Sequence, residues 1–146
     1  MRYIGSKVST RDAVYNIVTK GISNGTFCDP FGGIATMSSY FKEKDFRVYT
    51  SDLLTFANYF QTAKLYYNEY PKFKRLFSKL NIKEHKELLE YLNKLFIDKG
   101  WFLDEYSKNR QFFTYDNASK IGAINKKIKE WHKKNYITNK ENAFLV

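Results

Sequence analysis

The chain has 146 residues, of which 43% are hydrophobic and 18% aromatic, and its formal net charge is +10 at pH 7. A chain of this length buries one hydrophobic core, so we expect a single compact unit. It lacks both the roughly 20 consecutive apolar residues of a membrane-spanning helix and the apolar segment of a signal peptide, which indicates a cytoplasmic protein. The positive charge favours an anionic partner, most often nucleic acid, although simple solubility is the alternative explanation.

The first predicted elements are a loop, a helix and a turn. Residues 1–7 are expected to be an extended or looped entry. Thr10 is a candidate N-cap for a helix that ends near Gly21. The apolar residues of this helix share one face: Ala13, Val14, Ile17 and Val18.

The stretch from Phe27 to Thr36 carries the main functional signal. It is typical of a strand that delivers Asp29 to a sharp turn, where Gly32 and Gly33 let the backbone approach a ligand before a helix begins. The same residues are also an ordinary turn signal in proteins that bind no ligand there. We therefore expect either the loop of a nucleotide-like cofactor site or a plain connection.

A second predicted strand, residues 46–50, ends just before Asp52. Asp52 follows the glycine turn by roughly 20 residues, and an acidic side chain at this spacing in a β-turn-α-β unit binds ribose hydroxyls. The G-x-G-x-x-G pattern of dinucleotide sites is absent, so an NAD-dependent enzyme is not expected. The second strand and its acidic residue favour the cofactor interpretation of the glycine turn.

Cys28 is the only cysteine of the chain. A single cysteine excludes an internal disulfide and any all-cysteine metal site. Because Cys28 lies in the first predicted strand beside Phe27, we expect a buried and unreactive thiol.

The remainder of the chain has helical periodicity, and we find no further convincing strand after the second one. A helical pattern runs from Leu53 until Pro71 interrupts it, and a short basic segment, residues 72–79, comes next. Apolar residues between Leu88 and Phe96 predict an amphipathic helix. The stretch 101–115 is less regular, and its part from Arg110 to Tyr115 is interpreted as a loop with buried aromatic side chains.

Asn117 is a candidate cap for a long final helix whose other faces are rich in lysine. Its apolar positions recur at intervals of three and four residues: Ile121, Ile124, Ile128 and Trp131. Its candidate nucleic-acid-binding residues are Lys126, Lys127, Lys133 and Lys134. Such a face is either simply solvated or a phosphate-contacting surface, and the sequence favours neither.

Three motifs together resemble the opening part of the Dam-like class of adenine-specific DNA methyltransferases. They are Tyr3-Ile4-Gly5-Ser6-Lys7, Phe27-Cys28-Asp29-Pro30-Phe31-Gly32-Gly33 and Tyr49-Thr50-Ser51-Asp52-Leu53, in that order. The segments Arg110-Gln111-Phe112-Phe113 and Asn117-Ala118 are similar to the helical region that follows in that family. The resemblance covers nearly the whole chain.

The resemblance implies an α/β chain with a partial Rossmann-like methyltransferase fold, in which a short parallel sheet is followed by a mostly helical region. Residues 1–70 would bind S-adenosylmethionine, and residues 71–146 would contact DNA. The enzyme would methylate the exocyclic amino group of adenine, as the methylases of restriction-modification systems do, in a base flipped out of the duplex.

Roles for individual residues are also implied by the resemblance alone. Tyr3, Gly5, Ser6 and Lys7 would line the methionine side of the cofactor. The loop under the cofactor would consist of Asp29, Pro30, Phe31 and Gly33, with Asp29 near the methionine amino group. Asp52 would hold the ribose hydroxyls, and Leu53 would touch the adenine ring.

Two departures from the family pattern matter. Ala35 stands where the family usually has a second small, glycine-like position, which we interpret as a mild change. The catalytic motif of the family, Asp or Asn followed by two prolines and an aromatic residue, is absent, because the two prolines are Pro30 and Pro71. We therefore assign no catalytic residue and no metal site to this chain. We interpret it as an N-terminal portion of such an enzyme.

An incomplete sheet leaves apolar surface uncovered, so we expect a homodimer or a complementing C-terminal methyltransferase chain. The alternative function is a basic nucleic-acid-binding protein that keeps a methyltransferase-like part without catalysis. A third hypothesis is another S-adenosylmethionine-dependent enzyme that acts on RNA or protein.

Overall fold

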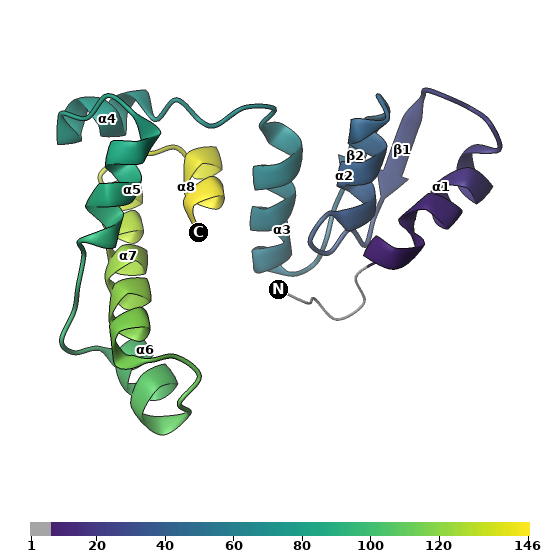
Figure 1. Cartoon of the computed structure of the whole chain (residues 1–146). Helices are drawn as coiled ribbons and strands as arrows, with labels where there is room; N and C mark the ends of the chain where they lie inside the picture. The colour runs from purple at the N-terminus through teal and green to yellow at the C-terminus, as the bar shows by residue number, and fades with distance from the viewer. Residues whose placement is uncertain (1–6) are drawn as a thin grey trace. The chain divides into compact units, whose positions relative to one another are not determined.

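The computed structural model describes residues 7–146 (Figure 1). The chain divides into two compact units, Met1–Pro71 and Lys72–Val146, and each is described by itself. Among the described residues, both strands belong to the first unit. That the units join in one compact body, and that residues 1–70 bind cofactor while residues 71–146 contact DNA, stay predictions.

The first unit alternates helices with strands, as an α/β fold does. The two predicted strands form where the sequence places them, as β1 (Thr26–Asp29) and β2 (Arg47–Thr50). Its helical elements are η1 (Val8–Thr10), α1 (Arg11–Thr19), α2 (Thr36–Glu43), α3 (Thr55–Gln61) and the π-helical η2 (Thr62–Tyr66). No third strand occurs among residues 7–146, as expected.

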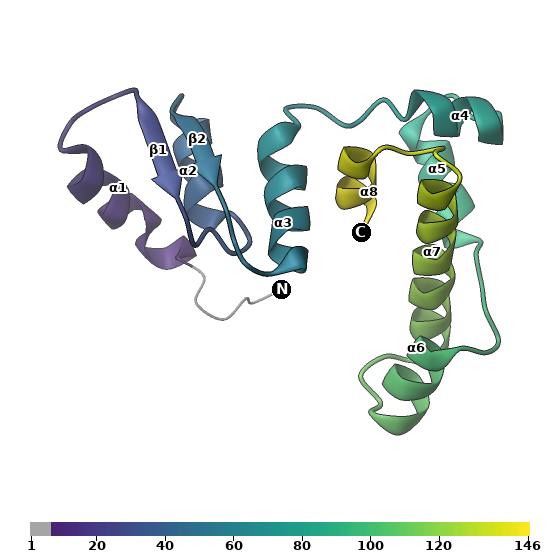
Figure 2. The ribbon, with the colours of Figure 1, turned by 180° about the vertical axis from the view of Figure 1, so that it is seen from behind.

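β1 and β2 pair in parallel, with Cys28 opposite Tyr49 and Asp29 opposite Thr50. The connecting helix α2 packs on one face of this pair, and Figure 2 shows the other face of the sheet with no helix of the unit in front of it. Because side chains alternate along a strand, Cys28 and Tyr49 both lie exposed. Parallel sheets are usually covered on both faces, whereas within the described part of the first unit this sheet has one uncovered face.

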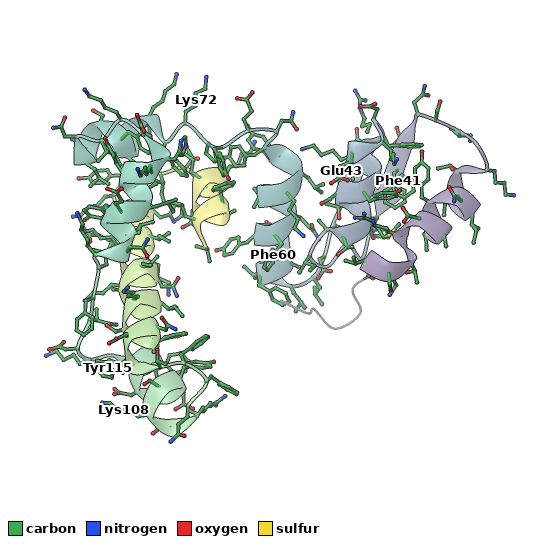
Figure 3. The ribbon with its side chains drawn as sticks, viewed as in Figure 1. Phe41, Glu43, Phe60, Lys72, Lys108 and Tyr115 are labelled. Atoms are coloured by element: carbon green, nitrogen blue, oxygen red, sulfur yellow. The ribbon has the colours of Figure 1, made fainter. Side chains whose placement is uncertain are left out.

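The core of the first unit is aromatic. Phe41 of α2, labelled in Figure 3, is almost fully buried, and its ring stacks on that of Phe27 with 3.7 Å between centroids. Tyr15 of α1 and Phe46 each place a ring centroid 5.2 Å from that of Phe41. Burial of these rings holds α1 and α2 on the strands.

The second unit consists of helices. Its elements are α4 (Lys74–Leu80), α5 (His85–Asn93), α6 (Trp101–Leu103), the π-helical η3 (Asp104–Asn109), α7 (Tyr115–Lys133) and α8 (Asn139–Leu145). Residues 110–114 form the predicted loop between η3 and α7. The prediction that its aromatic side chains are buried is wrong, because Phe112, Phe113 and Tyr115 are exposed.

One hydrophobic cluster joins α4, α5 and α7. It contains Phe73, Leu76, Leu88, Leu92, Ile128, Trp131 and Ile137, and all of these side chains are buried. The three-and-four spacing of the apolar residues therefore identified the inward side chains Leu88, Leu92, Ile128 and Trp131 correctly, but Leu89 and Phe96, predicted on the same face as Leu88, are exposed.

Three local expectations need correction. The side chain of Thr114 caps α7 by accepting a hydrogen bond from the Asn117 backbone N–H (3.3 Å), so Asn117 is the third residue of the helix and not its cap. Thr10 precedes α1, as predicted, but its side chain forms no capping hydrogen bond. Cys28 is exposed and not buried, because its side chain lies on the open face of the sheet.

Candidate cofactor site

The segments that follow β1 and β2 meet at the carboxyl end of the sheet. The Ser51 N–H donates to the Asp29 carbonyl (3.0 Å), and the Gly32 N–H donates to the Ser51 carbonyl (3.0 Å). The Ser51 hydroxyl also donates to the Pro30 carbonyl (3.1 Å). These bonds hold the glycine loop against the segment that carries Asp52. In open α/β sheets, ligands bind outside this end of the strands.

The Asp52 carboxylate connects the two segments. One of its oxygens accepts the Gly33 N–H (2.9 Å), and the other accepts the Leu54 N–H (3.0 Å). The backbone N–H groups of Leu54 and Gly33 lower the pKa of Asp52, so this carboxyl group is ionised at neutral pH. A carboxylate oxygen can accept two hydrogen bonds, and each Asp52 oxygen accepts one of these two, so an acceptor position on each oxygen is left for the hydroxyls of a diol.

Two glycines shape the loop for different reasons. Gly33 has φ of +50°, a left-handed conformation that glycine adopts at little cost, and it is this residue whose N–H reaches Asp52. Gly32 packs so closely on β2 that an added Cβ would overlap the Thr50 hydroxyl oxygen. A larger residue at position 32 would therefore push the loop off the strand.

Ala35 keeps the backbone conformation of a glycine. Its φ is +60°, and its side chain is fully buried. A left-handed residue other than glycine costs roughly 1–2 kcal/mol. The alanine therefore adds strain to the loop, which the sequence interpretation of a mild change did not include.

Asp29 occupies the last position of β1 and is half-buried. One carboxylate oxygen accepts a hydrogen bond from the Ser38 hydroxyl (3.0 Å), and Ser38 is itself fully buried in α2. The other oxygen has no hydrogen-bond partner among residues 7–146. Ser38 thus orients a carboxylate that keeps one oxygen for a cationic or hydrogen-bonding ligand.

Two large apolar side chains of the predicted site lie in solvent. Phe31 is 89% exposed and Leu53 is 97% exposed, and Pro30 between the loop and β1 is exposed as well. Both apolar side chains are therefore accessible to a ligand or partner. The predicted contact of Leu53 with an adenine ring stays a prediction.

α3 and η2 support the glycine loop through side chains that the sequence analysis missed. The buried Gln61 amide donates to the Gly33 carbonyl (3.1 Å), and the Lys64 ammonium donates to the Ile34 carbonyl (2.7 Å). Burial lowers the pKa of Lys64. Both contacts join segments about 30 residues apart in the chain. Periodicity and turn signals describe only neighbouring residues, so they cannot predict such contacts.

The first predicted motif falls largely outside the described residues. Tyr3, Gly5 and Ser6 lie outside the described residues, and their predicted roles remain untested. Lys7 is exposed and directly precedes η1. The described part of the site therefore consists of Asp29, Pro30, Phe31, Gly33, Asp52 and Leu53.

The four predicted nucleic-acid-binding lysines fall into two pairs at the end of α7. Lys127 (3.0 Å) and Lys134 (2.7 Å) both form ion pairs with Glu130. Lys126 and Lys133 are exposed and form no ion pair with any described carboxylate. The two hydrogen-bonded ammonium groups, Lys134 first and Lys127 second, lower the pKa of Glu130 to about 2.

Two searches of residues 7–146 gave no site of another kind. There is no group of three or more histidine, cysteine, aspartate or glutamate residues that could hold a metal ion. No helix in this range has the length and apolar character needed to cross a membrane.

Sequence comparisons find relatives along the entire chain. It is 34% identical to the Type II methyltransferase M.FokI of Planomicrobium okeanokoites and 28% identical to the modification methylase LlaI of Lactococcus lactis subsp. lactis, with 100% of this chain aligned in both. The Type II methyltransferase M.NlaIII of Neisseria lactamica is 27% identical, again over the full chain.

The chain spans only 23% of M.FokI, 24% of the LlaI methylase and 43% of M.NlaIII. No protein-family model matches it, and no solved structure does. The relationship predicted from the three motifs is nevertheless confirmed: over its whole length, this chain is a relative of part of the Type II DNA methyltransferases.

Proposed function

We propose that the chain is the cofactor-binding portion, from the N-terminal side, of an adenine-specific DNA methyltransferase with a Rossmann-like catalytic fold. The observation that carries this proposal is the carboxylate of Asp52, held by the Gly33 and Leu54 N–H groups at the carboxyl end of β2. An acidic residue in that position of a β-turn-α-β unit binds ribose hydroxyls. The full-length similarity to methyltransferases supports the same assignment.

The side chains of the site fit S-adenosylmethionine. This cofactor has a ribose diol, a cationic methionine end and a flat adenine ring, and the site offers one feature for each. Asp52 has free acceptor positions for the diol, and Asp29 has a free oxygen for the ammonium group. The exposed side chain of Leu53 would cover the ring. When bound, the cofactor supplies the methyl group on its sulfonium sulfur.

The chain's own residues would bind and orient the cofactor. Methyl transfer to an adenine amino group also needs hydrogen-bond acceptors for that amine and an aromatic side chain that stacks on the flipped base. The motif that supplies these groups in the family is absent from the sequence. We therefore propose that catalysis requires a complementing polypeptide that carries this motif.

The open sheet supports such a complementing chain. Among residues 7–71, β1 and β2 each have an unpaired edge, and one face of the sheet is uncovered. Apolar side chains of α1 and the following turn are also exposed, among them Ile17 and Ile22. Additional strands and helices of a methyltransferase would cover these surfaces. A second copy of this chain would cover them without supplying the missing motif.

DNA is the proposed substrate, and the charge of +10 suits its phosphates. Because the substrate is DNA, we propose the cytoplasm as the place of action and the modification half of a restriction-modification system as the context. The same charge also favours the alternative function, a nucleic-acid-binding protein without catalysis. Cofactor binding separates the two functions.

The test is a calorimetric titration of the full chain with S-adenosylmethionine, repeated on Asp52→Ala. We expect saturable binding that weakens by at least about tenfold in the variant, the loss that follows from removing a charged hydrogen-bond acceptor. Asp98→Ala, which removes an exposed carboxylate of the second unit, is the matched control and should bind like the wild type.

A chain that fails to bind the cofactor even after addition of a complementing methyltransferase polypeptide would contradict the proposal. In that case, salt-sensitive DNA binding without cofactor binding would favour the non-catalytic alternative.

A further inference from the structure

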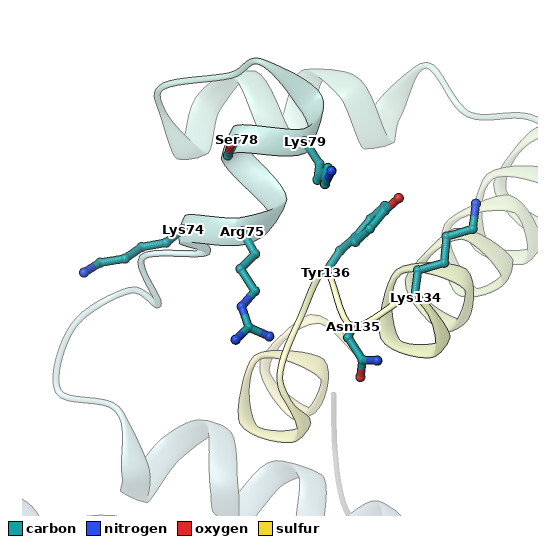
Figure 4. Close-up of a pocket in the computed structure, with 7 residues that line it drawn as sticks. All are labelled: Lys74, Arg75, Ser78, Lys79, Lys134, Asn135 and Tyr136. Carbon is teal, nitrogen blue, oxygen red and sulfur yellow. The ribbon is translucent and has the colours of Figure 1, made fainter.

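The second unit contains a shallow pocket whose wall is mainly basic (Figure 4). We call it the α4 pocket. It is lined by Lys74, Arg75, Ser78, Lys79, Lys134, Asn135 and Tyr136. These residues come from α4 and from the turn that ends α7, two segments that are about 60 residues apart in the chain.

Packing of the hydrophobic core fixes the α4 wall. Leu76 of α4 and Phe73 just before it are buried in the cluster that also contains Trp131. With these two side chains directed inward, Arg75 and Lys79, four residues apart, share the opposite, exposed side of the helix. The basic side chains are therefore presented by a helix that the core holds in place.

The α7 wall is fixed by a tight helix end. Asn135 adopts a left-handed conformation (φ +56°), the Tyr136 N–H donates to the Trp131 carbonyl (2.9 Å), and the Asn135 N–H donates to the His132 carbonyl (3.0 Å). These are the hydrogen bonds of a Schellman motif, in which asparagine can replace glycine. Because the next residue, Ile137, is buried in the core, the Tyr136 ring is held beside α4.

Figure 4 shows Arg75 and Lys79 extending from α4 on the side of the Tyr136 ring. The Lys79 ammonium lies 5.8 Å from the centroid of that ring. Neither Arg75 nor Lys79 forms an ion pair with a described carboxylate, whereas the fourth cation of the pocket, Lys134, is paired with Glu130. The pocket therefore has cationic groups whose charge no described acid neutralises.

We propose that the α4 pocket binds the phosphate backbone of duplex DNA. Arg75 and Lys79 would contact phosphate oxygens, and Ser78 and Tyr136 would supply hydroxyl donors, a mixture typical of backbone contacts. A shallow, exposed pocket suits a repeating phosphate chain better than a small anion, which proteins usually enclose. This inference rests on the proposed function and deepens it, because it places the DNA contact on α4 and the end of α7 and not on the exposed α7 lysines Lys126 and Lys133.

The experiment measures the affinity of the full chain for a DNA duplex at several salt concentrations. The pocket variant is Arg75→Ala/Lys79→Ala. Its matched control is Lys126→Ala/Lys133→Ala, which removes the same charge from the two exposed α7 lysines outside the pocket. A second pocket variant, Arg75→Lys/Lys79→Arg, keeps the charge, and thermal unfolding by circular dichroism verifies that each variant folds.

We expect the pocket variant to lose about tenfold or more in affinity at low salt, and the slope of log affinity against log salt to fall by about two, one for each lost phosphate contact. The control should change the affinity less than threefold, and the charge-keeping variant should retain most of the binding. Equal losses in the two alanine pairs, a larger loss in the α7 pair, or no DNA binding by the wild type would overturn the proposal.

Cofactor binding is measured separately on the same proteins, so the two proposals fail independently. The pocket variant should titrate with S-adenosylmethionine as the wild type does, because the residues proposed to hold the cofactor all lie in the other unit. A salt-dependent loss in the pocket variant without any cofactor binding would support the pocket and contradict the methyltransferase assignment.

Discussion

Single residues of the glycine loop show why some site features are visible in a sequence. Asp29, Gly33 and Asp52 were predicted because turn chemistry and strand ends are local, and the structure places all three at the carboxyl end of the sheet. Gln61 and Lys64 were missed because their hydrogen bonds to the loop depend on how α3 and η2 pack. The cofactor roles of Asp29, Gly33 and Asp52 remain proposals, whereas their positions at the end of the sheet are observed.

Ala35 offers a test of the loop at this scale. In Ala35→Val, a β-branched residue in the left-handed region and the added volume in a buried site should destabilise the first unit by about 2–4 kcal/mol. Ala35→Gly relieves the backbone strain, which stabilises the fold. It also removes a buried methyl group and adds conformational entropy to the unfolded chain, which both destabilise the fold. These effects nearly cancel, so stability should change by less than about 1 kcal/mol. Hydrogen-exchange protection of the α2 amides measures both effects.

Tryptophan fluorescence comes from Trp101 and Trp131, which both lie in the second unit, so it serves as an internal reference for the Ala35 variants. A valine variant with wild-type protection in α2 would show that position 35 is not strained.

At the scale of elements, helices with regular apolar spacing were predicted well, and those without it were not. α5 and α7 have inward faces that repeat every three or four residues, and the structure buries Leu88, Leu92 and Ile128 as expected. α6 continues directly into the π-helical η3, and the three-and-four repeat of apolar residues is broken there. The cap of α7 was misplaced by three residues, because threonine and asparagine are both good caps and only the backbone distinguishes them.

The end of α7 should respond to pH through Glu130. Lys134 and Lys127 hold the pKa of this carboxyl group at about 2 in the folded chain, against 4.5 as its ordinary value. A depressed carboxyl pKa stabilises the fold above the ordinary value, and the contribution disappears as the pH falls from 4.5 toward 2. The Glu130→Gln variant should therefore be less stable than the wild type at neutral pH and equally stable near pH 2.

Urea unfolding of the second unit, followed by the fluorescence of Trp101 and Trp131 at a series of pH values, measures this convergence. Glu90→Gln removes an exposed carboxylate of α5 that forms no ion pair with any described residue, so it is the control and should not produce the same pH-dependent difference. A difference between Glu130→Gln and the wild type that stays constant with pH would contradict the assigned ion pairs.

At the scale of the whole molecule, the sequence predicted an α/β portion followed by helices and an incomplete sheet. The structure has two parallel strands with an open face in one unit and helices in the other. The open face also explains the error at Cys28, since burial of that strand was assumed to be complete. How far such a sheet extends is not encoded in local patterns, because the neighbouring strands of a sheet come from segments that lie apart in the sequence.

The central claim is that the loops after β1 and β2 form the cofactor site. The most direct measurement is a titration of the ¹⁵N-labelled full chain with S-adenosylmethionine, followed by NMR shifts of the backbone amides. We predict saturable shifts concentrated at Gly32, Gly33 and the residues from Asp52 to Leu54, whereas the amides of α4, α5 and α7 stay in place. Shifts confined to the second unit, or no saturable shift at millimolar cofactor, would contradict the claim.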